Sequence, residues 1–207
     1  MTPTRQPAAA KPSSKTVQKV DDNALDTRSI ATPAMVIDIA QINANLSRLS
    51  AIKSRTGCMI LSALKAFSSY SCFELISSVL DGAACSSPNE VYLASEEFGG
   101  HIHLYSPAYS ELDLVRCMDK VHTIVFNSAT QLSRLSPYIK ERGFKGSCGV
   151  RINPKHSEVQ TDLYDPCRFQ SRLGISKDQM SKTLISNISG FHLHTLCDSQ
   201  FDAFERT

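Results

Sequence analysis

The sequence lacks the features that mark membrane and nucleic-acid-binding proteins. None of its apolar runs approaches the roughly 20 residues that a helix needs to cross a bilayer. Its basic residues are dispersed, its net charge is +2, and it has no basic patch interleaved with aromatic residues. We therefore expect neither a membrane-spanning segment nor a nucleic-acid partner.

Cysteine pairs spaced for metal or redox chemistry are also missing. The seven cysteines are scattered and include no Cys-x-x-Cys pair, so neither a zinc site nor a redox motif has support. An odd number of cysteines, without a secretory signal, favours reduced thiols inside the cell. We therefore expect a cytoplasmic protein.

The first 29 residues lack hydrophobic periodicity. They are rich in Pro, Ala, Ser, Thr and Lys, and no acidic residue precedes Asp21. Such a segment cannot bury enough apolar surface to offset the entropy lost on ordering. We predict a disordered tail over 1–29 and one folded domain over 30–207. Because the tail is basic and acid-poor, it also weakly resembles an organellar transit peptide, which is the alternative interpretation.

From Thr32 onward, short apolar runs alternate with stretches of helical spacing. Seven strands are predicted, over 33–38, 58–64, 82–87, 101–105, 123–126, 148–153 and 188–194. Alternation of this kind predicts right-handed β-α-β units and a parallel sheet, and seven repeats favour an α/β fold of the (β/α) barrel type. No Gly-x-Gly-x-x-Gly follows the first strand, which argues against a dinucleotide fold. An eighth strand is not found, so we expect an incomplete barrel with two unpaired edges.

One lysine ends the apolar run 60–64. Lysine is almost never fully buried without a partner, so Lys65 either reaches water at the open end of its strand or is held by a ligand. A bound aldehyde would hold it, because a partly desolvated lysine amine can form a Schiff base.

Other polar residues fall at the predicted carboxyl ends of strands, where (β/α) barrels gather their functional groups. They are Ser86, Ser87, Arg151, Asn153, His192 and His194. His192 and His194 share one face of their strand and could bind a metal, or could be core histidines bonded to backbone. No third ligand is evident, so we predict no metal site. His101 and His103 begin their strand and are interpreted as structural. Together, these residues favour a cofactor aldehyde at Lys65 whose ring is stacked by a histidine.

Several motifs carry a resemblance to a known family. They are TPAMVID at 32–38, ALKAFS at 63–68, RINPKHSE at 151–158, YDPC at 164–167, SRLGI at 171–175 and GFHLHTLC at 190–197. The chain resembles the fold-type III, alanine-racemase-like decarboxylases that use pyridoxal 5'-phosphate. The later motifs resemble the carboxynorspermidine decarboxylase branch of that family.

The resemblance implies roles for individual residues. Lys65 would carry the cofactor and His194 would stack on its ring. Cys197 stands where related decarboxylases place a serine that meets the cofactor phosphate. Arg151 would lie near the cofactor, and Arg172 would bind the substrate. Ala84 stands where ornithine decarboxylases carry an aspartate.

The resemblance also implies an activity and a partner. The activity is decarboxylation of carboxynorspermidine or carboxyspermidine to norspermidine or spermidine in polyamine biosynthesis, by a homodimer. The family's glycine-rich phosphate loop, the acidic partner of the pyridine nitrogen and the C-terminal β-domain would lie beyond Thr207, so the chain resembles an N-terminal part. Two alternatives stay open: an inactive fragment or binding remnant, and a single-domain carrier of the same cofactor. The 164–175 segment argues against the carrier.

Overall fold

The computed structural model describes residues 27–196 and 199–207. Most of the predicted tail over 1–29 therefore lies outside the described residues. By its internal contacts the chain divides into two units, Met1–Asp38 and Ile39–Thr207. The described part of the first unit contains one short 3₁₀-helix, Thr27–Ser29.

The predicted strand over 33–38 is wrong. These residues belong to no strand, and Met35 and Val36 are 97% and 53% exposed. A strand obtains its backbone hydrogen bonds from a neighbouring strand. In the described part of the chain, residues 33–38 pair with none, so their apolar composition alone does not produce a strand.

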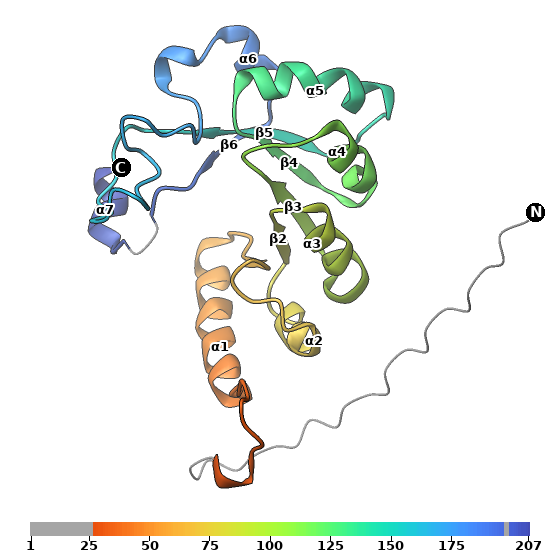
Figure 1. The fold of residues 1–207 in the computed structure, drawn as a ribbon, viewed down its shortest axis with the longest axis vertical. Coiled ribbons are helices and arrows are strands. Elements are labelled where there is room, and N and C mark those ends of the chain that lie inside the picture. Colours follow the sequence, from red (N-terminus) through yellow and green to blue (C-terminus); the bar gives the residue numbers. More distant parts are fainter. Residues whose placement is uncertain (1–26, 197–198) are drawn as a thin grey trace, which may run out of the picture. The chain divides into compact units, whose positions relative to one another are not determined.

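The second unit is built on one parallel sheet (Figure 1). Its six strands are β1 (Leu61–Ala63), β2 (Gly82–Cys85), β3 (His101–Tyr105), β4 (Thr123–Phe126), β5 (Ser147–Ile152) and β6 (Gly190–Leu193). They lie side by side in sequence order, and each neighbouring pair is parallel. This is the order of consecutive strands in a (β/α) barrel, so the predicted α/β barrel type is confirmed as a curled half-barrel.

Seven helices accompany the described strands. They are α1 (Ile39–Thr56), α2 (Phe73–Ser77), α3 (Pro88–Leu93), α4 (Glu111–Cys117), α5 (Ala129–Glu141), α6 (Lys182–Ser186) and α7 (Phe201–Arg206). Figure 1 shows α3, α4 and α5 along one side of the sheet. The hydrophobic core lies between these helices and the sheet. Its largest fully buried side chains include Leu104, Leu114, Phe126 and Leu135. The opposite side of the sheet is thereby left for a ligand site.

Serine residues cap the N-termini of helices α3 and α5, on the helix-covered side of the sheet. The side chain of Ser87 accepts a hydrogen bond from the amide of Glu90 at 3.2 Å, and Ser128 accepts one from the amide of Gln131 at 3.1 Å. Such N-caps satisfy amides that the first helical turn leaves without partners. Ser86 donates its amide to the Glu90 carboxylate at 2.6 Å. Ser86 and Ser87, predicted as candidates for the mouth of the barrel, therefore act locally at the start of α3.

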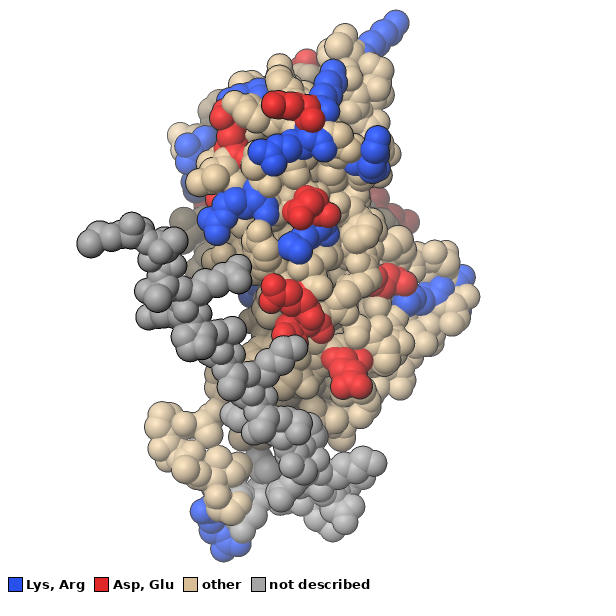
Figure 2. Space-filling view, turned by 90° about the vertical axis from the view of Figure 1, so that its right-hand side faces the viewer, with Lys and Arg blue, Asp and Glu red and all other residues tan. Residues whose placement is uncertain are grey.

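The described surface carries charges of both signs. Figure 2 shows Lys and Arg interspersed with Asp and Glu over one face of the molecule. No helix in the described ranges combines the length and the apolar character that a membrane crossing requires.

Candidate functional site

Lys65 lies two residues beyond the carboxyl end of β1. The chain turns there, with the Ala66 amide donating to the Ala63 carbonyl at 3.0 Å. The Leu64 amide donates to the carbonyl of Ala84 in β2 at 3.1 Å, which fixes the turn to the sheet. The Leu64 side chain is buried in the core, whereas Lys65 is exposed. Its amine is therefore available to a ligand at this end of the sheet.

The face of the sheet opposite the helices is concave. In β3, Ile102 and Leu104 are buried, so the alternating His103 and Tyr105 lie on the other face. The Tyr105 ring stacks on the ring of His192 in β6, with centroids 4.8 Å apart and planes at 22°. Two strands separate β3 from β6. In a flat sheet β3 and β6 would be about 14 Å apart, so rings in contact require a curled sheet.

Four rings meet on this concave face and are called here the ring stack: His103, Tyr105, His192 and His194. The His103 and His192 rings are stacked with centroids 5.7 Å apart, and the His192 and His194 rings are tilted at 5.6 Å. His192 therefore contacts the other members of the stack, while His194 lies just beyond the end of β6. The two histidines share one face of their strand, as the spacing predicts.

Arg151 of β5 is the buried cation of the site. Its side chain is 4% exposed, and its Cα is in register with that of His192. One terminal nitrogen donates to the Tyr105 hydroxyl at 2.7 Å, and the other donates to the His194 carbonyl at 2.9 Å. The guanidinium also lies 5.2 Å from the centre of the Tyr105 ring. These contacts fix the direction of a permanent positive charge.

The histidines of the ring stack are held neutral. Burial, reinforced by neighbouring His103, His194, Arg151 and Lys65, lowers the pKa of His192 to about 4. Burial first, and then Lys65 and Arg151, lowers the pKa of His194. The charged groups acting on these two rings are thus both cations. Uncharged imidazoles beside two cations form a site suited to an anionic ligand.

Three buried polar atoms around Arg151 lack hydrogen-bond partners in the described structure. They are Nε of Arg151, Nε2 of His192 and Oγ1 of Thr195. Buried polar groups are almost always hydrogen-bonded, so each unpaired atom calls for a partner. Since all three belong to β5, β6 or the residues that follow β6, a single polar ligand at this end of the sheet could satisfy them.

Three other residues were predicted for the site: Arg172, Cys197 and Asn153. Among the described residues, the Arg172 side chain makes no hydrogen bond; only its carbonyl is held, by the side-chain amide of Asn127 at 2.8 Å. Cys197 lies outside the described residues. Asn153 is buried, and its side chain donates to the Leu173 carbonyl at 3.1 Å, so it holds the 171–175 segment. The structure thus brings Lys65 and Arg151 together with His194.

Two members of the ring stack, His103 and Tyr105, were not predicted from the sequence as parts of the site. His101 makes a structural contact, with its Nε2 3.0 Å from the Thr123 hydroxyl. His103, two residues further along β3, instead joins the ring stack. The signal that could have identified both is the alternation in 101–105, where polar rings occupy the face opposite two aliphatic residues.

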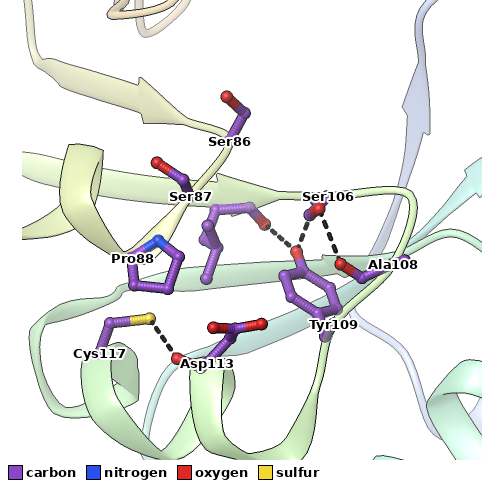
Figure 3. Close-up of a pocket in the computed structure, with 9 residues that line it drawn as sticks. Ser86, Ser87, Pro88, Ser106, Ala108, Tyr109, Asp113 and Cys117 are labelled. Atoms are coloured by element: carbon purple, nitrogen blue, oxygen red, sulfur yellow. Dashed lines mark hydrogen bonds between the residues drawn. The ribbon is translucent and has the colours of Figure 1, made fainter.

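A separate pocket of about 180 Å³ lies between the sheet and helices α3 and α4 (Figure 3). Tyr109 lines it, and its hydroxyl donates to the Leu104 carbonyl and accepts from the Ser106 amide. The Cys117 thiol contacts the Asp113 carbonyl at 3.2 Å. Because these polar groups already have partners, the pocket gives no sign of a ligand. The candidate site is the concave face instead.

The pKa of His192 predicts a pH dependence of stability. Its folded value of about 4 lies below the ordinary 6.5, so unfolding takes up a proton between these values. The free energy of unfolding should therefore fall as the pH decreases from 6.5 towards 4. His192→Phe keeps a ring in the stack and removes this titration, so urea unfolding should show a shallower pH dependence. An unchanged dependence in the variant would show that the folded protein protonates His192 without penalty.

Comparison with known proteins shows that the chain is similar to decarboxylases, although no family model matches it. It is 38% identical over 179 residues to carboxyaminopropylagmatine decarboxylase from Synechocystis sp., covering 86% of this chain and 46% of that protein. It is 33% identical over 177 residues to carboxynorspermidine/carboxyspermidine decarboxylase from Herminiimonas arsenicoxydans, covering 85% and 47%.

A solved structure gives the same likeness in three dimensions. The crystal structure of carboxynorspermidine decarboxylase from Campylobacter jejuni, complexed with norspermidine, superposes with a TM-score of 0.74 at 29% identity. The match covers 86% of this chain and 44% of that one. The chain thus spans about half the length of the relatives that it matches.

Proposed function

Because this chain belongs to the carboxynorspermidine decarboxylase family, we propose that it acts in an enzyme that removes carbon dioxide from a carboxylated polyamine. The observation that carries the proposal is the exposed amine of Lys65 at the end of β1, close enough to the His192 and His194 rings to influence their pKa values. An amine beside neutral rings and a fixed guanidinium is suited to a cofactor that carries an aldehyde and an anionic group.

We assign pyridoxal 5'-phosphate as that cofactor, and the unpaired atoms near Arg151 fit it. The phosphate and phenolic oxygens of the cofactor could accept hydrogen bonds from donors such as the free Nε of Arg151. Lys65 would hold its aldehyde carbon, His194 would lie against its ring, and Cys197 would contribute to the phosphate site. When bound, this cofactor supplies the electron sink that decarboxylation requires.

Each residue then has a definite task. Lys65 would hold the cofactor and would yield it to the amine of the substrate. His194 offers an uncharged ring face, because burial lowers its pKa. Arg151 presents a charge whose direction is set by Tyr105 and the His194 carbonyl. Arg172, the exposed residue of the 171–175 segment, is assigned to the substrate.

Two substrates are supported by the comparisons. The first is carboxynorspermidine or carboxyspermidine, named for relatives from two bacteria at 33% and 32% identity. The second is carboxyaminopropylagmatine, favoured by the 38% identity to the Synechocystis protein. Compared with carboxyspermidine, the second carries a guanidine in place of the terminal amine; carboxynorspermidine also has a carbon chain that is shorter by one carbon.

We further propose that the enzyme is a cytoplasmic homodimer with its folded domain over 30–207. The apolar surface of the second unit supports an association with further protein. Phe201 and Phe204 of α7 are both exposed, with their ring centroids 6.3 Å apart, and Phe191 of β6 is exposed as well. Exposed apolar side chains that gather on one region mark an interaction surface.

A substrate panel tests the proposed function. The chain, extended with the C-terminal half of a relative, is given pyridoxal 5'-phosphate, and carbon dioxide release is measured from carboxynorspermidine, carboxyspermidine and carboxyaminopropylagmatine. We expect one end group to be preferred by about tenfold or more, because a site built to bond that group leaves its own polar atoms unpaired with the other substrate. Cofactor bound at Lys65 without carbon dioxide from any substrate would instead identify an inactive remnant or a carrier.

A further inference from the structure

Asn127 joins β3 to a distant segment of the chain through one carboxamide. It follows β4 directly and is buried. Its Oδ1 accepts hydrogen bonds from the Tyr105 hydroxyl at 3.0 Å and from the Gly174 amide at 2.9 Å. Its Nδ2 donates to the Arg172 carbonyl at 2.8 Å. One side chain thus holds the 171–175 segment against the strand that carries Tyr105.

The Tyr105 hydroxyl extends this connection to Arg151. It accepts a hydrogen bond from the Arg151 guanidinium at 2.7 Å while it donates to Asn127. A phenol has one proton to donate and oxygen lone pairs to accept with, so both bonds can exist together. Burial raises the pKa of Tyr105, which keeps that proton in place. The resulting sequence of bonds runs from Arg151 through Tyr105 and Asn127 to the backbone at 172 and 174.

Both ends of this sequence are anchored. The Asn127 amide donates to the Gln131 side chain at 2.6 Å, which ties Asn127 to the first turn of α5. The Ile175 amide donates to the Arg151 carbonyl at 2.9 Å, and the Asn153 amide donates to the Ile175 carbonyl at 2.7 Å. The segment is therefore bonded to β5 at one end and to Asn127 at the other. Because the segment is hydrogen-bonded at both points, a change at either one should shift its backbone.

We propose that Tyr105 and Asn127 are positioning residues that form a relay, coupling the orientation of the Arg151 guanidinium to the placement of the segment that carries Arg172. Neither residue needs to touch the ligand. The relay ensures that an anionic group bound at Arg151 meets the 171–175 segment in one arrangement. Its effect on ligand binding rests on the proposed function, whereas its effect on the segment does not.

The first test needs no cofactor. Both this test and the second one use the chain extended with the C-terminal half of a relative. Amide hydrogen exchange is measured in the wild type, Tyr105→Phe, Asn127→Ala and Asn127→Asp. We expect exchange over 173–175 to rise by about tenfold in Asn127→Ala, because Gly174 loses its acceptor. Asn127→Asp keeps the acceptor for Gly174 but loses the donor to the Arg172 carbonyl, so exchange at Gly174 should rise less than in Asn127→Ala. If Asn127→Ala fails to fold, Asn127→Asp and Tyr105→Phe still decide the matter.

Tyr105→Phe is the discriminating variant. The hydroxyl that it removes is hydrogen-bonded to Asn127 and Arg151 and to no atom of the 171–175 segment, so faster exchange there would be an effect transmitted through those partners. The matched control is Tyr138→Phe, which removes a hydroxyl that donates to Glu111 at 2.6 Å, between α4 and α5. It should leave 173–175 unchanged. Wild-type exchange in Tyr105→Phe would overturn the relay.

The second test measures the dissociation constant of pyridoxal 5'-phosphate by its absorbance. Tyr105→Phe and Asn127→Ala should each raise it by about tenfold, and the double variant should raise it no further, because residues in one network are not additive. Effects that multiply to about a hundredfold would overturn the coupling. A wild type that binds no cofactor would refute the proposed function, while the exchange measurements would still decide the relay.

Discussion

Replacing Lys65 by arginine should abolish covalent attachment of pyridoxal 5'-phosphate. An amine can form a Schiff base with an aldehyde, whereas a guanidinium stays charged and does not. Arginine keeps a positive charge close to His192 and His194, so the variant removes the chemistry and preserves the electrostatics. The measurement is borohydride reduction of the protein with cofactor, followed by peptide mapping of the reduced adduct.

The matched control for this experiment is Lys140→Arg. Lys140 is exposed on α5, on the side of the sheet away from the ring stack. Its replacement should leave the label on Lys65 at the wild-type level. Reduced adduct on a different lysine in the wild type, or undiminished adduct in Lys65→Arg, would remove Lys65 from the site.

Expressed by itself, the 207-residue chain should associate or stay partly folded, and should release no carbon dioxide. In the described sheet β1 pairs only with β2, and β6 only with β5, so both edges offer unpaired backbone groups. Each group buried without a partner costs about 1–3 kcal/mol, against a typical total stability of about 5–15 kcal/mol. A chain extended with the remaining half of a relative should become monodisperse and active, as size-exclusion chromatography and a carbon dioxide assay would show.

The exposed face of β6 offers a way to separate edge association from general misfolding. Phe191 and Leu193 are 53% and 38% exposed there. Changing both to lysine should reduce association, because charged edges resist pairing with another chain. Leu112→Lys, at an exposed position of α4 remote from the edge, should have little effect. A monodisperse, active 207-residue protein would contradict the prediction altogether.

Much of the sheet could be predicted from the sequence, because short apolar runs bounded by turn signals carry most of the information. The structure gives β3 and β4 the predicted bounds, His101–Tyr105 and Thr123–Phe126. The run at 33–38 has a similar apolar composition but forms no strand. Composition describes what a strand can bury, whereas a strand also needs a backbone partner, which composition does not specify.

The site also has features that could be predicted from the sequence and features that could not. Lys65, Arg151 and His194 could be placed together because parallel strands bring their carboxyl ends to one edge of the sheet. The contacts of Tyr105 and Asn127 could not be predicted, because their partners are remote in sequence: His192 for the first and Gly174 for the second. Those contacts depend on how strongly the sheet curls and on the path of an irregular segment. Neither quantity is encoded in a local spacing.

The pairing of each strand with its predecessor also has a kinetic consequence. A newly synthesised strand always meets a partner that left the ribosome before it, so the sheet can grow from its N-terminal end without long-range searching. The ring stack does not follow this order, because His103 and Tyr105 emerge early and must wait for His192 on β6. The scaffold can therefore form before the site, and two inward-facing rings stay exposed until β6 docks.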